Sequence, residues 1–507
     1  MSRGAAKEGY NSPPMRAHVA TLDLVVLAAY FAATMAVGVG LSRRSRSVEG
    51  FTAAGRSLPG WLTGLSILGT YVSSITFLAL PAKAFADNWN AFVFSLSIPL
   101  ATWIAARWFV PFYRGTAHVS AYRHLEARFG PWARAYASLC YLATQLARMG
   151  TVMYLMALPM SALLGWDVRG VILLTGISVT IYALTGGLVA VIYADALQTI
   201  VLMAGALLSA TLAVAALPGG AGEVFRVAAE HGKFSLGSFG ASVSGPTVWV
   251  VLLYGLVINL QNFGIDQNYV QRYIASRSDA EARKSVWLGG LAYFPLSALF
   301  LFIGTALFAY YSAHPASLPD GLGDPARADW VFPWYIVTVL PPGVAGLLIA
   351  AIFAAAMSTI STCLNSSATI VLSDYYRRYV NREATERQSI RVLRVTTVAW
   401  GLAGTGAALA MTRVRSALDA WWTLAGIFGG GMLGLFLLGF LSRRATGRAA
   451  LGGVAAGVLL TLWMTLSPRW AAFPAALRSP FHEFLVIVFG TAAVLAVGWG
   501  LSAKADS

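Results

Sequence analysis

Charged residues are scarce in this chain. Only 11% of its 507 residues are Asp, Glu, Lys or Arg, whereas 57% are hydrophobic, and the mean hydropathy is +0.66. A soluble domain of this length fills its core with a smaller apolar share, so this composition excludes an ordinary soluble protein. We therefore expect an integral membrane protein whose surroundings are the lipid bilayer.

Cysteine and histidine are rare as well, with two and six residues. Cys140 and Cys363 both fall inside hydrophobic segments, which excludes a disulfide framework and a cysteine-based metal site. The histidines lie in the leader, in loops or at segment ends, without the spacing of metal ligands. An intramembrane enzyme would need a metal cluster or a nucleophile beside a base, so we expect no enzyme.

Long hydrophobic segments, in contrast, are abundant. About thirteen of them can cross the roughly 30 Å hydrocarbon core of a bilayer. They cover residues 22–41, 60–84, 90–113, 134–164, 169–186, 189–216, 246–271, 285–311, 333–372, 390–411, 416–441, 449–466 and 482–502. Segment 333–372 is too long for one straight crossing, so we expect an external lead-in and an internal extension. We expect the first segment to be a retained helix and residues 1–21 before it to be a disordered leader.

The net charge of +15 is distributed unevenly over the loops. Arginine and lysine concentrate after the first, third, seventh, ninth and eleventh segments; the group after the seventh is Arg272, Arg277, Arg283 and Lys284. With thirteen crossings all these groups fall on one side, and the positive-inside rule makes that side cytoplasmic. The N-terminus is then outside and the C-terminus inside. This distribution indicates membrane orientation and no nucleic-acid partner.

Two segments carry polar residues and glycine at membrane depth. Residues 64–82 contain Gly69, a cluster of Ser and Thr, and Pro81, and residues 251–273 contain two glycines with Asn, Gln and Asp266. Unwound backbone at this depth is tolerated where it lines a cavity or meets protein partners. Each segment opens a group of five helices, which is typical of an inverted-repeat transporter with its site at the midplane. The alternative is that these small residues only allow close helix packing.

Hydroxyl groups line one face of a later helix. Ser358, Ser361, Thr362 and Asn365 follow the spacing i, i+3, i+4, i+7. A single hydroxyl in a membrane helix commonly donates a hydrogen bond to a carbonyl of the preceding turn, but a cluster of hydroxyls needs a further explanation. Neutral oxygens suit a hard cation such as sodium, and a break at residues 69–72 would add free carbonyls.

Asp195 is the one acid deep in a hydrophobic segment. A carboxylate at this depth is costly and marks an ion or proton path. The alternative is that Asp195 only stabilises a helix N-terminus near the Gly186–Gly187 turn.

Two stretches resemble the signature segments of the sodium/solute symporter family: GGLVAVIYADALQ at residues 186–198 and AAIFAAAMSTISTCLNSSATIVLSDYY at residues 350–376. The resemblance extends from about residue 22 to the last segment, although Ala194 replaces a common Thr or Ser. It implies an all-α membrane protein with the five-plus-five inverted repeat of the bacterial leucine transporter. The expected parts are an extra helix at 22–41, repeats at 60–216 and 246–441, and two final helices at 449–502.

The resemblance also implies ion sites. The first sodium ion would be held by the carbonyls of Gly69, Val72 and Ala355 and the hydroxyls of Ser358 and Thr359. Some family members bind a second sodium ion, for which the matching residues are Asp195, Ser358, Ser361 and Thr362. One or two Na+ ions per cycle are therefore expected.

The stretches SSITFLALPAKAF (73–85), NYVQRYI (268–274) and LARMGTVMYL (146–155) are similar to the sialic acid branch of that family. Arg148 stands where that branch grips the substrate carboxylate, and a mid-membrane arginine is well matched by a bidentate carboxylate. Alternatively, Arg148 caps helix carbonyls or pairs with a protein acid. The substrate residues implied by the resemblance are Arg148, Ser73, Thr76, Phe77, Tyr71 and Ser95. Tyr71, Ala91 and Ser95 depart from that branch, where a small hydroxyl residue, an aromatic and a glutamine stand.

The resemblance implies a sodium-coupled symporter of the inner membrane that imports a small carboxylated solute, with sialic acid as the first candidate. Another sugar acid, a small organic acid and a neutral sugar are alternatives, as is proton coupling through Asp195. Few residues follow the last segment, so we expect no signalling module of the kind a membrane sensor needs. We expect the chain to function as a monomer.

Overall fold

The computed structural model describes residues 19–116, 118–413, 424–470 and 472–504. Within these ranges the regular elements are helical, apart from one isolated bridge between Leu58 and Ser276. The helices α1 to α17 are Thr21–Gly40, Val48–Ala53, Gly60–Tyr71, Ser74–Ala86, Phe92–Leu96, Ile98–Ile104, Val110–Gly115, Arg123–Phe129, Pro131–Leu164, Val168–Ala215, Gly220–Glu230, Val248–Ile265, Gln267–Ala275, Asp279–Ala313, Val331–Thr338, Val344–Ile370 and Glu386–Met411. They are followed by α19 (Met432–Leu441), α20 (Gly447–Leu466) and α21 (Leu485–Lys504).

Ten described helices are long and apolar enough to cross a membrane, or eleven if the bent pair α3–α4 counts as one span. The all-helical membrane architecture predicted from the sequence is therefore confirmed. Helix α9 corresponds to the predicted segment 134–164. The 48-residue α10 contains the two predicted segments 169–186 and 189–216.

Gly187 divides α10 into two arms. Its backbone has φ 51° and ψ −153°, a conformation that interrupts the helix and suits glycine. A Cβ on Gly187 would also lie 2.8 Å from the ring of Phe51. The Gly186–Gly187 turn expected from the sequence is thus built by both backbone conformation and close packing.

The first broken helix is the pair α3 and α4, whose axes differ by 56°. Helix α3 ends at Tyr71, and Val72 is extended, with φ −82° and ψ 117°. Ser73 then caps α4, since its Oγ accepts a hydrogen bond from the Thr76 N–H at 3.4 Å. The predicted break after Gly69 is confirmed.

The second broken helix is the pair α12 and α13, which meet at Asp266. The Asp266 backbone is extended, and its Oδ1 accepts a hydrogen bond from the Asn268 N–H at 2.7 Å. Two interrupted helices therefore stand at the positions where the sequence pattern places them.

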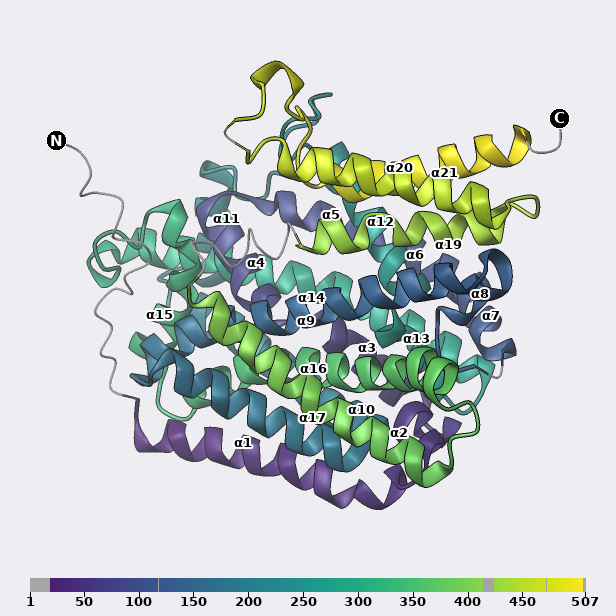
Figure 1. Ribbon diagram of the computed structural model, residues 1–507. Coiled ribbons are helices and arrows are strands. Elements are labelled where there is room, and N and C mark those ends of the chain that lie inside the picture. The colour runs from purple at the N-terminus through teal and green to yellow at the C-terminus, as the bar shows by residue number, and fades with distance from the viewer. Residues whose placement is uncertain (1–18, 117, 414–423, 471, 505–507) are drawn as a thin grey trace.

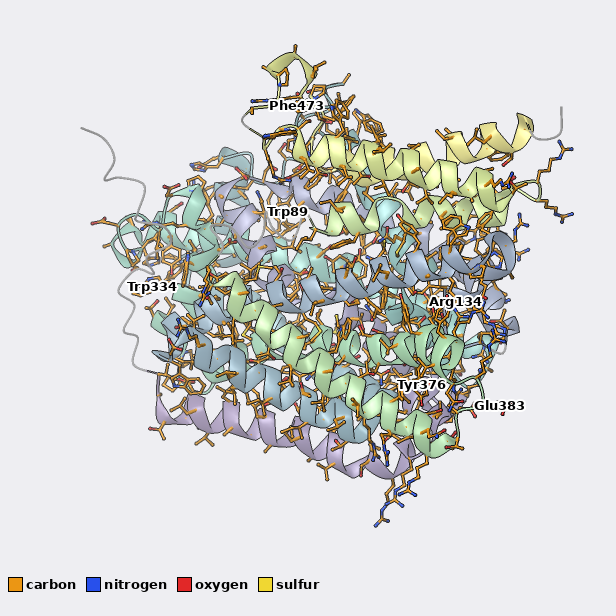
Figure 2. The ribbon with its side chains drawn as sticks, viewed as in Figure 1. Trp89, Arg134, Trp334, Tyr376, Glu383 and Phe473 are labelled. Atoms are coloured by element: carbon orange, nitrogen blue, oxygen red, sulfur yellow. The ribbon has the colours of Figure 1, made fainter. Side chains whose placement is uncertain are left out.

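Helices α1, α9, α16 and α17 run side by side across the molecule (Figure 1). The 27-residue α16 lies in the interior and is buried at nearly every position. It is preceded by α15 and followed by a π-helical extension, Val371–Val380, as expected for the long segment 333–372. Arg134, Tyr376 and Glu383 lie at one end of the molecule, and Trp89 and Trp334 lie at the other (Figure 2).

Two predictions fall partly outside the described residues. Residues 1–18 of the expected leader and residues 416–423 of the segment 416–441 are not among those described. The described part of that segment is helical from residue 424.

Candidate functional site

The break after α3 lies against α10 and α16. A Cβ added to Gly69 would stand 2.4 Å from Thr199 Oγ1, 3.1 Å from Ser358 Oγ and 3.3 Å from the Asp195 carbonyl oxygen. Only glycine allows the three helices to approach this closely. The structure thereby brings the unwound segment to the hydroxyl-bearing face of α16.

The hydroxyls of α16 converge on Asp195. Ser358 Oγ donates to Asp195 Oδ1 at 2.8 Å, and Ser361 Oγ lies 3.5 Å from the same oxygen. Thr362 Oγ1 lies 3.5 Å from Asp195 Oδ2. All four residues implied for a second sodium site therefore lie together, and each is at most 1% exposed.

Arg272 also belongs to this cluster, and its placement corrects the sequence analysis. We expected it in a cytoplasmic loop, but it lies within α13 and is 0% exposed. Its Nη2 donates to Asp195 Oδ2 at 2.8 Å and to Thr362 Oγ1 at 2.6 Å. A buried carboxylate requires such a partner, because an isolated charge is strongly destabilised in a low-dielectric interior.

Ser66 completes the contacts of this ion pair. Its Oγ donates to Asp195 Oδ2 at 2.6 Å and accepts from Arg272 Nε at 3.0 Å. Arg272 Nη1 donates to the Asn268 carbonyl oxygen at 2.6 Å. The guanidinium thus joins α3, α10, α13 and α16 at one point.

Of the residues implied for the first sodium ion, the structure brings Gly69 and Ser358 together. Thr359 Oγ1 donates to the Ala355 carbonyl oxygen at 3.2 Å, which places that hydroxyl and that carbonyl together. Gly69 is in the last turn of α3, where carbonyls have no intrahelical partner, and Val72 is in the extended break. Hydroxyl and carbonyl oxygens are ligands that suit a hard monovalent cation.

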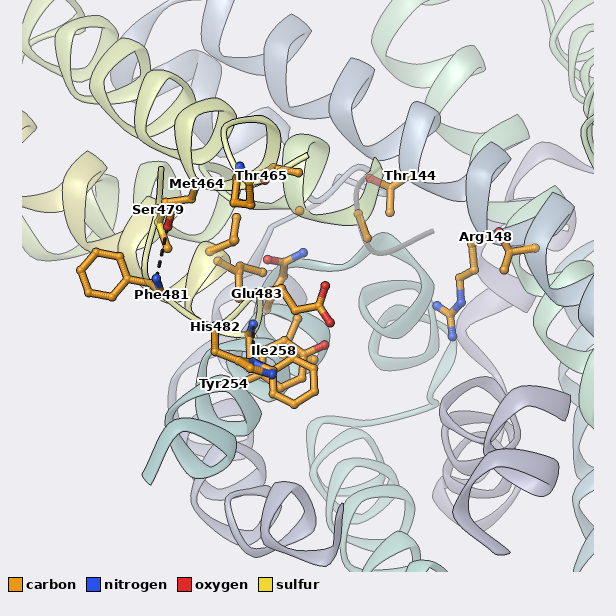
Figure 3. A pocket seen from close by; sticks show the side chains of 18 of the residues that line it. Thr144, Arg148, Tyr254, Ile258, Met464, Thr465, Ser479, Phe481, His482 and Glu483 are labelled. Atoms are coloured by element: carbon orange, nitrogen blue, oxygen red, sulfur yellow. Dashed lines mark hydrogen bonds between the residues drawn. The ribbon is translucent and has the colours of Figure 1, made fainter. Parts of the chain in front are cut away.

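Arg148 lines a cavity of about 670 Å³ that also contacts Ser73. Its Nη2 donates to the Thr70 carbonyl oxygen at 3.1 Å, and its other N–H groups have no acceptor among the described residues. Arg148 lies at one end of the cavity, and Ser479, Phe481 and His482 lie at the other (Figure 3). One N–H therefore caps a helix carbonyl, as the alternative interpretation held, while the guanidinium still borders the cavity.

The remaining implied substrate residues do not line this cavity. Phe77 is 0% exposed and packs against Phe300 and Phe332, with ring centroids 5.1 and 5.6 Å away. Thr76 lies beside Ser73, with their hydroxyl oxygens 3.5 Å apart. Ser95 is buried away from the cavity lining.

Tyr71 fills the space between the broken helices. Its hydroxyl donates to Asn259 Oδ1, and Asn259 Nδ2 donates to Ser97 Oγ at 2.9 Å. Its ring packs against Tyr293 and Phe263, with centroids 4.3 and 5.8 Å away. Tyr71 therefore connects α3 to α12 and lies outside the cavity lining.

Several polar residues that the sequence analysis did not select as substrate residues also line the cavity. Gln261, Asn262 and Asp266 come from the inner half of α12 and its break, a region already recognised as unusually polar. Thr151 and Gln145 lie on α9, one turn from Arg148 on either side. The Thr151 hydroxyl is buried and has no hydrogen-bond partner among the described residues. The i±3 spacing from Arg148 could have identified both residues.

The end of the cavity opposite Arg148 is formed by the connection between α20 and α21. His482 lies there, and partial burial lowers its pKa below the usual value. Arg469 and Glu483 approach within 3.7 Å at the same end. The cavity thus extends from Arg148 to a connection on the side opposite the arginine-rich loops.

Helix α13 closes the other side of the site. Every one of its residues is buried. Asn268 accepts a hydrogen bond from the Tyr141 hydroxyl at 2.8 Å and donates to Gln145 Oε1 at 3.1 Å. Gln271 Nε2 donates to Thr369 Oγ1 at 2.8 Å. These bonds hold α13 against α9 and α16.

The sequence matches a known protein family. Residues 51–457 match the model of the sodium:solute symporter family. The sodium/sialic acid symporter NanT of Aliivibrio fischeri is 34% identical, covering 94% of this chain and 92% of the relative. The sodium/sialic acid symporter SiaT of Proteus mirabilis is 32% identical, covering 94% of both chains.

Solved structures show the same fold. A substrate-bound, outward-open Na+-coupled sialic acid symporter superimposes with a TM-score of 0.89 at 31% identity, covering 96% of this chain and 98% of that chain. Mhp1, a nucleobase-cation-symport-1 family transporter, has a TM-score of 0.56 at 16% identity, covering 90% and 95%, and supports the leucine-transporter fold alone. The chain therefore belongs to the sodium:solute symporter family and is a multi-pass membrane protein that couples solute transport to sodium.

Proposed function

We propose that this protein imports a carboxylated, hydroxyl-rich solute together with sodium, and that sialic acid is the first candidate. The observation that carries the proposal is the hydrogen bond from Arg148 to the Thr70 carbonyl. Thr70 is adjacent to Gly69, which lies against Ser358. A substrate carboxylate on Arg148 and a sodium ion beside Ser358 would therefore act on the same unwound segment.

Coupling follows from that shared segment. Sodium between the break and α16 would hold the backbone in one shape and thereby position Arg148. Whatever sodium adds to the affinity for substrate, substrate must add to the affinity for sodium. Low internal sodium and a negative interior then favour release once the inner side opens.

The cavity favours a hydroxylated acid over simpler solutes. Arg148 supplies a cation for a carboxylate, while Gln261, Asn262 and Asp266 supply acceptors and donors for hydroxyl and amide groups. A neutral sugar would leave the guanidinium without an anion, and a small unhydroxylated acid would leave those polar groups unmatched. Two relatives named as sodium/sialic acid symporters support the same choice, and another sugar acid is the second candidate.

We assign the first sodium ion to Gly69, Val72, Ala355, Ser358 and Thr359. A second ion would bind at Asp195 Oδ1 with Ser358 and Ser361. There it would share the carboxylate with Arg272, whose guanidinium already contacts Oδ2 and Thr362. Arg272 compensates the charge of Asp195 in a buried ion pair without a proton, which supports sodium coupling over proton coupling.

We further propose an inner-membrane location with the N-terminus outside, since the arginine-rich loops lie on one side. The cavity then opens outward, and α13 closes the cytoplasmic side. One chain supplies all the residues of the site, so a monomer suffices for transport.

The proposal is tested by uptake of labelled sialic acid into proteoliposomes, with an imposed sodium gradient in one arm and a proton gradient without sodium in the other. Uptake is expected only in the sodium arm. Ser358→Ala should raise the sodium concentration needed for half-maximal uptake, because Ser358 contributes to both proposed sites. Uptake driven by protons alone, or unchanged sodium dependence in the variant, would contradict the proposal.

A further inference from the structure

A second hollow of about 760 Å³ lies on the surface of the helix bundle and shares no lining residue with the cavity at Arg148. It is formed by the chain just after α1, by α10 before its break, and by the first half of α17. These helices lie together in Figure 1. We call this hollow the α1–α10–α17 groove.

Two arginines stand at the groove. Arg46 follows α1 and Arg394 is on α17, and both are exposed. Within the described residues neither guanidinium group has a hydrogen bond or an ion pair. The hydroxyl-bearing residues Ser42 and Thr185 line the same groove. The groove therefore presents two uncompensated positive charges.

The other wall of the groove is apolar. Val395, Val398 and Leu402 line it and are 61%, 37% and 70% exposed. They follow Arg394 at helical spacing along a helix that is apolar enough to cross the membrane. Eight residues of helix rise about 12 Å, so this stripe leads from the charged end well into the hydrocarbon.

Close helix packing positions the walls. A Cβ on Gly38 of α1 would lie 2.4 Å from the Tyr182 Cβ, and one on Gly401 of α17 would lie 2.3 Å from Thr180 Oγ1. Both α1 and α17 therefore pack closely against α10, and the two contact points on α10 lie within one helical turn of each other. The groove lies next to these contacts, with Leu184 of α10 in its lining.

We propose that the α1–α10–α17 groove binds an anionic phospholipid, with its phosphate on Arg46 and Arg394 and an acyl chain along Val395, Val398 and Leu402. Guanidinium groups bind phosphate through charge-assisted hydrogen bonds, and an acyl chain satisfies an exposed apolar stripe in a membrane. The neighbouring arginines Arg43, Arg44 and Arg391 are exposed as well. This surrounding charge favours a lipid with a net negative headgroup over a zwitterionic one.

The test is native mass spectrometry of the full-length protein in neutral detergent, titrated with phosphatidylglycerol or with phosphatidylcholine that has the same acyl chains. The groove variant carries Arg46→Gln and Arg394→Gln. The matched control carries Arg283→Gln and Lys284→Gln, which remove the same charge from exposed positions on α14 outside the groove. A third variant, Ala399→Trp, fills the groove without changing charge.

The unmodified protein should retain phosphatidylglycerol in preference to phosphatidylcholine. The groove variant should bind phosphatidylglycerol about thirtyfold more weakly, given the contribution of each arginine near a membrane surface. Ala399→Trp should also weaken binding, and the control should bind as the unmodified protein does. Equal retention of the two lipids, equal losses in the groove and control variants, or unchanged binding by Ala399→Trp would overturn the proposal.

Discussion

Arg148 is the cation through which the proposed substrate contact is made, and its consequence for affinity can be measured. Arg148→Ala should weaken binding of an acidic substrate about a hundredfold or more, because removing one partner of a buried, hydrogen-bonded charge pair costs about 2 to 5 kcal/mol. Arg148→Lys should recover part of this loss, since it restores the charge without the planar fork. Binding is measured by isothermal titration calorimetry in sodium buffer.

Arg469 provides the matched control, because it lines the same cavity at the opposite end in a more exposed pair with Glu483. Arg469→Ala should change affinity only slightly, as expected for an exposed ion pair. Equal losses for Arg148→Ala and Arg469→Ala would mean that Arg148 has no specific role.

The ion pair between Asp195 and Arg272 allows both charges to be buried. Arg272→Met should destabilise the protein by about 3 to 5 kcal/mol, because it leaves a fully buried carboxylate without its cation. Combining it with Asp195→Asn should restore much of the stability, since neither charge then remains unpaired. Chemical unfolding of the single and double variants gives the coupling between them, and additive losses would contradict a direct pair.

Several residues could be predicted from the sequence, and others could not. Ser358, Ser361, Thr362 and Asp195 were identified because hydroxyls and an acid at membrane depth are unusual, and they do converge. Arg272 was assigned to a loop because a count of positive charges does not show which arginine pairs with a distant acid. The pairing depends on the rotation of α13 after its break, which tertiary packing determines.

Gly69 controls how closely the broken helix approaches α10 and α16. Gly69→Ala should lower the apparent sodium affinity by roughly tenfold to a hundredfold, because the added methyl group overlaps Thr199 and Ser358 and overpacking costs about 1 to 3 kcal/mol. Gly222→Ala in α11 is the control, since a Cβ there meets no atom within 4 Å. The readout is the sodium dependence of uptake.

Both variants replace glycine by alanine in a helix, so their intrinsic helix propensities change alike. A normal sodium response in Gly69→Ala, or an equal change in both variants, would contradict the proposal that the break between α3 and α4 forms part of the sodium site.

The helical elements were largely predictable, since hydrophobic length and glycine positions indicate crossings and breaks. The break between α12 and α13 is at Asp266, within the polar stretch selected from the sequence. The orientation of side chains around the breaks was less predictable. Tyr71, for example, turns toward Asn259 and the aromatic rings beside it, a choice made by neighbours from distant parts of the chain.

At the scale of the whole molecule, an open cavity lies on one side of the site and closely packed helices lie on the other. The cavity extends from Arg148 to the connection between α20 and α21, while α13 is completely buried against α9 and α16. In the proposed transport cycle α13 moves away from α9 and α16 as the inner side opens, and this movement would break the hydrogen bonds of Asn268 and Gln271. Sodium and substrate would favour the closed inner side by holding the unwound segment between α3 and α4 in place.

Thermal stability of the purified protein tests the central claim, that one unwound segment couples sodium to an acidic substrate. Each member of a panel of sugars and organic acids, sialic acid included, is added in sodium buffer and in potassium buffer. A ligand at a hundred times its dissociation constant stabilises the native state by about 2.7 kcal/mol, which is readily measured. We expect sialic acid, or another hydroxylated acid, to raise the melting temperature in sodium and not in potassium, and Arg148→Ala to abolish the rise. Equal stabilisation in the two buffers, or a rise that persists in Arg148→Ala, would contradict the account.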